Sequence, residues 1–213
     1  MNFLPLTVDD EYVYVGLWKR FCARVVDAFV LAPILIAFYF LPMVDKGLAI
    51  FIEIVLSVLA FMYPVYCHAK YGATIGKFAL KIRVTKPDGT KINWKEAWLR
   101  SAVDMIFTLI SLYVIILMLM MIDRERYIEI QNTIERSQFI VSYYPDWYPT
   151  LGNFQNVWLW LNVIVLFFNK RKRAIHDFIA GTVVVYKEFC DYEFDYIVPQ
   201  DHHKTQGIFR TKD

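Results

Sequence analysis

The hydrophobic positions of this chain are gathered in long blocks rather than spread at helical or strand spacing. Three blocks cover residues 25–44, 47–67 and 103–122. Each of them holds a single acidic residue, Asp27, Glu53 and Asp104 in turn. About 20 consecutive apolar residues are the length of one transmembrane helix. The pattern therefore predicts three membrane spans. Each contains one carboxyl group, whose charge is energetically costly inside the bilayer.

A fourth block, residues 152–168, is shorter and contains Asn156 and Asn162. It fits either a fourth span or a re-entrant or interfacial helix. The loop charges favour a span, because Lys and Arg accumulate on the cytoplasmic side of a membrane protein. Basic residues crowd three segments, 19–24, 70–100 and 170–173, which fall on one side only if the fourth block crosses. We therefore expect four spans with both termini in the cytoplasm.

Composition agrees with a membrane protein and excludes several other classes. The chain is 57% hydrophobic and 21% charged, with a mean hydropathy of +0.36. A net charge of +2, from 23 basic and 21 acidic residues, does not indicate a nucleic-acid partner. Three widely separated cysteines, Cys22, Cys67 and Cys190, suggest neither a disulfide framework nor a metal site. We expect no cofactor, no metal, and a location in the inner or plasma membrane with lipid as the immediate partner.

The polar segments divide the chain further. Residues 80–84 alternate apolar and basic side chains, and the turn sequence 87–89 follows, which predicts a short hairpin. The β-branched run 182–186 is suited to add a strand to it. The predicted fold is thus an all-α membrane protein of four transmembrane helices with a small cytoplasmic β-element. A cytoplasmic segment (1–15), a membrane domain (16–187) with an aromatic outer loop (123–151), and a polar cytoplasmic tail (188–213) make up the chain.

An internal similarity links the two halves of the sequence. Residues 75–84 and 175–184 share Ile, Phe and Val in register, and Trp18-Lys19-Arg20 resembles Trp98-Leu99-Arg100. One hypothesis is two parallel halves of two spans each, as in some transporter folds. A chance similarity is an equally good explanation, since apolar residues are common at such positions.

Three basic and acidic pairs have helical spacing near the expected cytoplasmic ends of the spans. They are Arg24 with Asp27, Arg100 with Asp104, and Arg173 with Asp177. On a helix, residues three or four apart can meet on one face. Their functional interpretation is a polar cluster that binds a cation or relays protons, and their structural interpretation is a clasp of ion pairs that fixes the helix ends.

Glu53 differs from these residues because no basic side chain lies within helical reach of it. It is either a neutral acid bonded to a neighbouring helix or, with Asp27, one of two carboxylates on a path for a proton or sodium ion. The Gly72–Lys77 segment is one residue short of phosphate-loop spacing. His176-Asp177 has no accompanying nucleophile motif, so we expect no enzyme.

Together these motifs resemble the RDD family of bacterial integral membrane proteins, named for one arginine and two aspartates. The resemblance rests on residues 16–27, 72–77, 82–84, 88–89 and 172–184. By position, Arg24 and Asp27 are similar to the family arginine and first aspartate, and Asp177, or else Asp104, to the second. The long outer loop departs from the family pattern.

The resemblance implies transport of an unidentified ligand, and sodium–proton exchange has been proposed for some members. The leading hypothesis is therefore a transporter, with cation–proton exchange as one form of it. Four spans are few for a transporter, so a homo-oligomer or a membrane-protein partner is expected. The alternative is a non-transporting membrane subunit or adaptor that binds protein partners.

Overall fold

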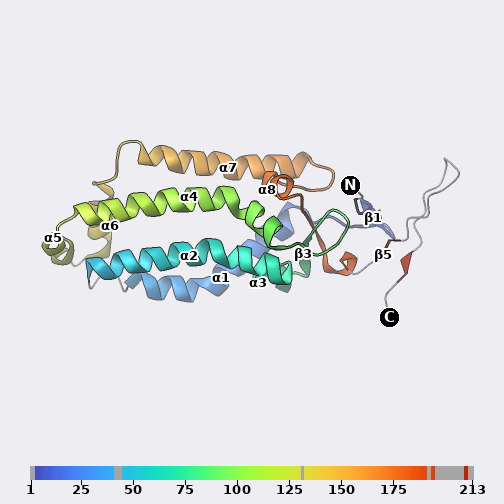
Figure 1. The fold of residues 1–213 in the computed structure, drawn as a ribbon, viewed down its shortest axis with the longest axis horizontal. Helices are drawn as coiled ribbons and strands as arrows, with labels where there is room; N and C mark the ends of the chain where they lie inside the picture. The colour runs from blue at the N-terminus through green and yellow to red at the C-terminus, as the bar shows by residue number, and fades with distance from the viewer. Residues whose placement is uncertain (1–2, 41–44, 131, 191–192, 195–208, 211–213) are drawn as a thin grey trace.

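Four long helices lie side by side, and short strands gather at one end of them (Figure 1). The computed structural model describes residues 3–40, 45–130, 132–190, 193–194 and 209–210. The long helices are α1 (Leu17–Phe40), α2 (Lys46–Tyr71), α4 (Trp94–Met121) and α7 (Tyr148–Phe168). The short helices are α3 (Ile75–Ala79), α5 (Arg124–Glu129), α6 (Thr133–Val141), α8 (Ile175–Ile179) and the 3-10 turn η2 (Lys187–Phe189). The strands are β1 (Thr7–Val8), β2 (Glu11–Tyr12), β3 (Ile82–Thr85), β4 (Val183–Tyr186), β5 (Glu193–Phe194) and β6 (Phe209–Arg210).

Three helices, α2, α4 and α7, are long and apolar enough to cross a membrane. The fourth hydrophobic block thus forms a helix of 21 residues, which is long enough for a complete span. Residues 25–40 of the first block lie within α1, a helix of 24 residues. Residues 41–44 at the end of that block lie outside the described residues, and the crossing by α1 stays a prediction.

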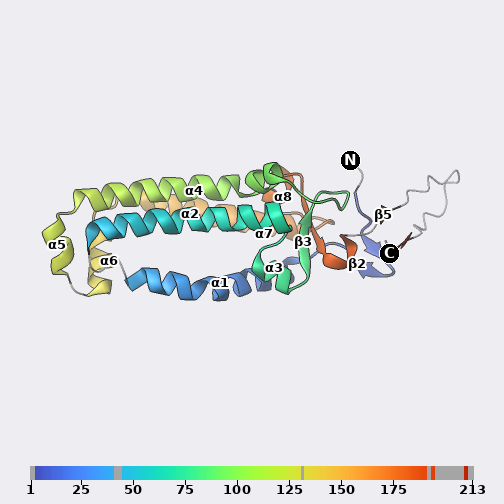
Figure 2. The same ribbon diagram turned by 60° about the horizontal axis from the view of Figure 1, so that its bottom comes forward.

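The four long helices are not equally packed. The α2 and α4 helices make the closest pair, whereas α1 packs mainly on the short helix α3. Figure 2 shows α1 set apart from the α2–α4 pair. Beyond its first turns α1 exposes Phe29, Ile34 and Ile36. These apolar side chains fit a helix that faces lipid or another membrane-embedded surface.

The expected hairpin after residue 80 is wrong in its main pairing. The turn forms, because the N–H of Lys86 donates to the carbonyl of Thr90 at 2.9 Å. The returning chain makes only one bridge, Thr85 with Lys91, before Asn93 caps α4. Strand β3 pairs with β4, antiparallel over four residues, which confirms the strand expected from the run 182–186. The need to start α4 so soon leaves no length for a second hairpin strand, and the β-branched run 183–186 takes that place.

The first described residues are part of the same folded end. Tyr14 forms an isolated bridge with Val185, and the N–H of Val15 donates to Val184 at 3.0 Å. A buried apolar cluster joins this segment to β4 and the residues after it: Leu4, Val8, Val13, Tyr14, Val183, Val185 and Phe189. Residues 3–15 and 183–189 therefore lie at one end of the helices. This arrangement agrees with an even number of membrane crossings. Which side of the membrane this end faces stays a prediction.

The two sequence halves meet in the sheet. Helices α3 and α8 each have five residues, follow a long helix and precede a strand. The antiparallel register places Val84 opposite Val184, and these two residues also correspond in the internal similarity. A two-fold relation between halves would produce this pairing. The helix packing is not symmetric, however, because α2 lies close to α4 while α1 and α7 have little contact. The two-half hypothesis therefore stays a prediction.

The first part of the outer loop is fixed to the end of the bundle that lies opposite the sheet. Tyr127 of α5 is buried with Ala49 of α2 and Ile122 at the end of α4. Arg124 forms an ion pair with Asp45 at 2.7 Å. The α5 segment thus covers the end of the α2–α4 pair.

Candidate functional site

A buried carboxylate joins three helices at the sheet end of the bundle. Asp177 lies in α8 and is fully buried. Its carboxylate accepts hydrogen bonds from Arg20 of α1 at 2.7 Å and from Arg100 of α4. The N–H of Ala174, which precedes α8, also donates to it, at 3.0 Å. One acid thus links the starts of α1 and α4, and we call Arg20, Arg100 and Asp177 the Asp177 triad.

Further polar groups surround the triad and tie α7 to it. Arg100 also donates to the hydroxyl of Thr182 at 2.9 Å and lies 3.1 Å from Nε2 of His176. The other ring nitrogen, Nδ1 of His176, lies 2.8 Å from Oδ1 of Asn162 on α7. Because a guanidinium only donates and the amide oxygen only accepts, the ring carries its proton on Nδ1 and is neutral. The cluster is therefore a closed hydrogen-bond network.

The electrostatics of this cluster follow from burial and from the two arginines. Burial would raise the pKa of Asp177, but the charges of Arg100 and Arg20 outweigh it and hold that pKa well below the aspartate range. Burial lowers the pKa of His176 well below its usual value; Asp177 opposes this shift, and Arg100 adds to it. At neutral pH the triad thus carries one negative and two positive charges beside a neutral imidazole.

The neutral His176 predicts a pH-dependent stability. When its pKa is lower in the folded than in the unfolded state, its contribution is complete above the unfolded value of about 6.5 and is lost as the pH falls below it. Asp177 has the same sign, but its contribution is complete above about pH 3.9. We expect the melting temperature in detergent to decrease from pH 7.5 to pH 5, and His176→Gln to weaken this dependence. The same pH dependence in both proteins would contradict the assignment.

The three pairs expected from helical spacing do not form among the residues that the structure describes. Asp27 accepts instead from the hydroxyls of Tyr63 and Thr74 and from the N–H of Gly76, each at 2.7 Å. These donors come from α2 and from the start of α3. A carboxylate in this position therefore fixes α3 against α1, and three donors replace the expected partner Arg24.

The other two expected pairs are replaced in the same way. Asp104 accepts from Nε1 of Trp158 at 2.9 Å, because Arg100 is directed to Asp177. Arg173 donates to the backbone carbonyls of Thr182 and Asp177, each at 3.1 Å, and not to a carboxylate. Asp177 thus forms its ion pairs with Arg20 and Arg100 rather than with Arg173.

Sequence reasoning missed Arg20, although one signal pointed to it. Arg20 and Arg100 occupy the same place in the Trp-x-Arg similarity between the halves. Both arginines bind the same carboxylate, so the similarity marks two equivalent donors rather than two separate pairs.

The Gly72–Lys77 segment has a structural explanation. Gly72 ends α2 in a left-handed conformation, with φ of 67°. A Cβ at Gly76 would lie 2.0 Å from the carbonyl oxygen of Ala23, so α3 approaches the backbone of α1 closely. Lys77 then lies 2.7 Å from Nε2 of His68. The loss of hydration on burial, together with the nearby charge of Arg100, lowers the pKa of Lys77 well below its usual value.

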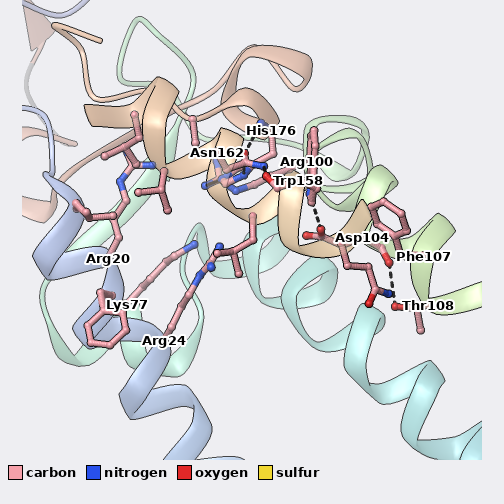
Figure 3. Close-up of a pocket in the computed structure, with 17 residues that line it drawn as sticks. Arg20, Arg24, Lys77, Arg100, Asp104, Phe107, Thr108, Trp158, Asn162 and His176 are labelled. Atoms are coloured by element: carbon pink, nitrogen blue, oxygen red, sulfur yellow. Dashed lines mark hydrogen bonds between the residues drawn. The ribbon is translucent and has the colours of Figure 1, made fainter. Parts of the chain in front are cut away.

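A cavity of about 700 Å³ opens beside the triad (Figure 3). Its walls come mainly from α1, α4 and α7: Leu17, Arg20, Phe21, Arg24, Lys77, Arg100, Asp104, Phe107, Thr108, Gln155, Trp158, Leu159, Asn162, Val163, Leu166, Ala174 and His176. In the close-up, Arg24 and Lys77 extend from one side, and Asp104 and Trp158 lie on the other. The cavity therefore has a basic side and a side with one carboxylate.

Glu53 does not join this site. It lies on α2 ten residues before Tyr63, the residue that donates to Asp27. Ten residues of helix span about 15 Å. Glu53 is half-buried, and no hydrogen bond or ion pair is found for it within the described part of the chain. The described residues also contain no cluster of three metal-ligating side chains.

The comparison with protein families decides the identity of the chain. The model of the RDD family matches residues 14–181, which include the Asp177 triad and every wall of the cavity. The chain belongs to the RDD family. A search of curated proteins and a search of solved structures each found no match. With its long apolar helices, this RDD protein is a membrane protein.

Proposed function

We propose that this RDD protein is a carrier that moves a small ligand across the membrane, with the cavity between α1, α4 and α7 as its binding chamber. The cavity is the observation that carries the proposal. Its volume lies in the range of about 300 to 1,000 Å³ that is usual for ligand sites. Charged side chains within apolar helices mark ligand and ion pathways in membrane proteins.

The unequal packing of the helices supports a carrier. A carrier requires one part of the bundle to move against another. Helix α1 is held at its sheet end by the contact of Ala23 with Gly76 and by the bond of Arg20 to Asp177. The outer part of α1 packs little on the other long helices. In our proposal this part of α1 moves, while the Asp177 triad holds its inner end.

Cation–proton exchange is one form of the proposal, and it requires a carboxylate that a ligand can reach. Asp27 already accepts three hydrogen bonds, so it is a poor candidate. Asp104 lines the chamber and accepts a single bond, from Trp158. In this form Asp104 rather than Asp27 binds the cation or proton, and Glu53 is the candidate carboxylate toward the other end.

Transport by purified protein in liposomes tests the proposal. With a pH-sensitive dye inside the liposomes, we expect flux under sodium, potassium or proton gradients. Asp104→Asn should reduce this flux at least about tenfold, because a neutral amide neither binds a cation strongly nor exchanges a proton. Asp123→Asn, at an exposed position between α4 and α5, is the matched control and should transport normally.

Two results would contradict this form of the proposal. One is the absence of flux under every cation gradient, and the other is equal flux in Asp104→Asn and Asp123→Asn. If Arg24→Gln and Asp104→Asn both left transport unchanged, the chamber itself would be excluded as the ligand path.

A further inference from the structure

We infer that the basic side of the chamber holds the phosphate headgroup of an anionic phospholipid, whose acyl chains lie between α1 and α7. This inference goes beyond the proposed function, because the lipid is a resident ligand rather than the cargo. Four properties of the chamber carry it: its charge, its depth in the membrane, its apolar walls and the packing around α1.

The charge of the chamber favours an anion. Arg20 and Arg100 both bind Asp177, so the triad keeps one excess positive charge. Arg24 lines the chamber and has no hydrogen bond or ion pair among the residues described. The acidic wall residue, Asp104, is bonded to Trp158 on the opposite side. A guanidinium in a spanning helix is costly without a counter-ion, and phosphate is the anion that fits its planar fork.

The depth of Arg24 matches a headgroup. Tryptophans concentrate where a membrane meets water. Trp18, Trp94 and Trp98 are all exposed and lie at the starts of α1 and α4. Arg24 follows Trp18 by six residues, or about 9 Å of helix. Its long side chain can extend back toward the interface, so its guanidinium reaches the level of the lipid phosphates.

The walls of the chamber select a lipid rather than a soluble anion. Phe21, Phe107, Leu159 and Leu166 face the cavity from α1, α4 and α7. A free phosphate ion would gain nothing from these apolar side chains. An acyl chain would be buried by them and would also cover the exposed apolar surface of α1, such as Phe29, which is 75% exposed.

The loose packing of α1 leaves room for such chains. Helices α1 and α7 have little contact although both line the cavity. Along the expected span, α1 exposes apolar side chains such as Phe29, Ile34 and Ile36. Lipid chains are the material that fills such a space in a membrane protein without requiring a second polypeptide.

The test is lipid binding by the full-length protein in mild detergent, measured by native mass spectrometry. The probes are phosphatidylglycerol and phosphatidylcholine with identical acyl chains, at equal concentrations. We expect preferential retention of phosphatidylglycerol. Arg24→Gln should weaken its binding about fivefold, the equivalent of one basic residue near an anionic lipid. Lys95→Gln removes an exposed charge at the same end, outside the chamber, and should change binding less than twofold.

A second variant separates charge from folding defects. Asp104→Asn keeps an acceptor for Trp158 but removes the repelling carboxylate, so it should strengthen phosphatidylglycerol binding several-fold. A general loss of structure cannot produce opposite effects in Arg24→Gln and Asp104→Asn. Equal retention of the two lipids, or equal effects of Arg24→Gln and Lys95→Gln, would overturn the inference.

Other occupants of the chamber would also be recognised. Displacement of phosphatidylglycerol by an equal concentration of glycerol phosphate would show a site for soluble phosphates. A lipid-free protein that forms dimers through α1 would show that a second copy covers this surface. Either result overturns the inference. The measurement uses no ion gradient, so a failure of transport leaves it unaffected, and a failure of lipid binding leaves the carrier proposal standing.

Discussion

Asp177→Asn is expected to destabilise the protein by about 3–5 kcal/mol, the usual cost of removing one partner of a buried ion pair. Arg20 and Arg100 are both buried and both direct a guanidinium nitrogen at this carboxylate. An asparagine offers them one neutral oxygen and places an amide group against positive charge. Two buried cations then lack a counter-charge, which destabilises the folded state.

The measurement is the melting temperature and the folded yield of the purified protein in detergent. Asp123→Asn is the matched control, because it removes the same charge from an exposed position. Arg20→Gln should have a smaller effect than Asp177→Asn, since Asp177 keeps Arg100 and the N–H of Ala174. A melting temperature for Asp177→Asn equal to that of the control would show that the triad contributes little to stability.

Gly76→Ala should have the second large effect, a loss of about 3 kcal/mol or more through overpacking. The new methyl group would lie 2.0 Å from the carbonyl oxygen of Ala23 and 3.0 Å from the carboxyl carbon of Asp27. The first of these contacts is with backbone, which cannot move aside alone. Helix α3 must therefore shift away from α1, which breaks the hydrogen bonds that Asp27 accepts from Thr74 and Gly76.

Gly152→Ala provides the comparison for this variant. Gly152 lies inside α7, and an added methyl group there has no neighbour within 4 Å. Alanine is a better helix former than glycine by about 0.5–1 kcal/mol, so this variant should melt at the same or a higher temperature. Equal melting temperatures for Gly76→Ala and Gly152→Ala would show that the close approach of α3 to α1 is not needed for folding.

The sequence predicted the long helices because their cause is local. A run of apolar residues predicts a long helix whatever the rest of the chain contains. Even the least apolar run, 152–168, forms a helix of spanning length. The pairing of charges could not be predicted in this way. Arg20 is 157 residues from Asp177, and helical spacing indicates only neighbours within one turn. The expected pair of Arg24 and Asp27 failed because α3 brings three donors to the carboxylate from another part of the chain.

The predicted addition of the run 182–186 to the strand at 82–85 was correct. The second strand of the expected hairpin failed for a related reason. The turn at 87–89 was identified correctly, since turn chemistry is also local. A second strand was expected after this turn because nothing in the sequence shows how early α4 begins. The internal similarity corresponds to two features of the structure. It pairs Val84 with Val184, as the sheet does, and it aligns Arg20 with Arg100, the two donors to Asp177.

The position of Asp177 along the chain has a consequence for biosynthesis. During translation, α1 and α4 leave the ribosome long before α8, so Arg20 and Arg100 enter the membrane region without their shared acid. Strand β4, which completes the sheet, emerges later still. A nascent chain that stops before residue 175 has its four long helices but nothing to neutralise the two arginines. The ion pairs that join the starts of α1 and α4 to α8 therefore form only after all four long helices have been made.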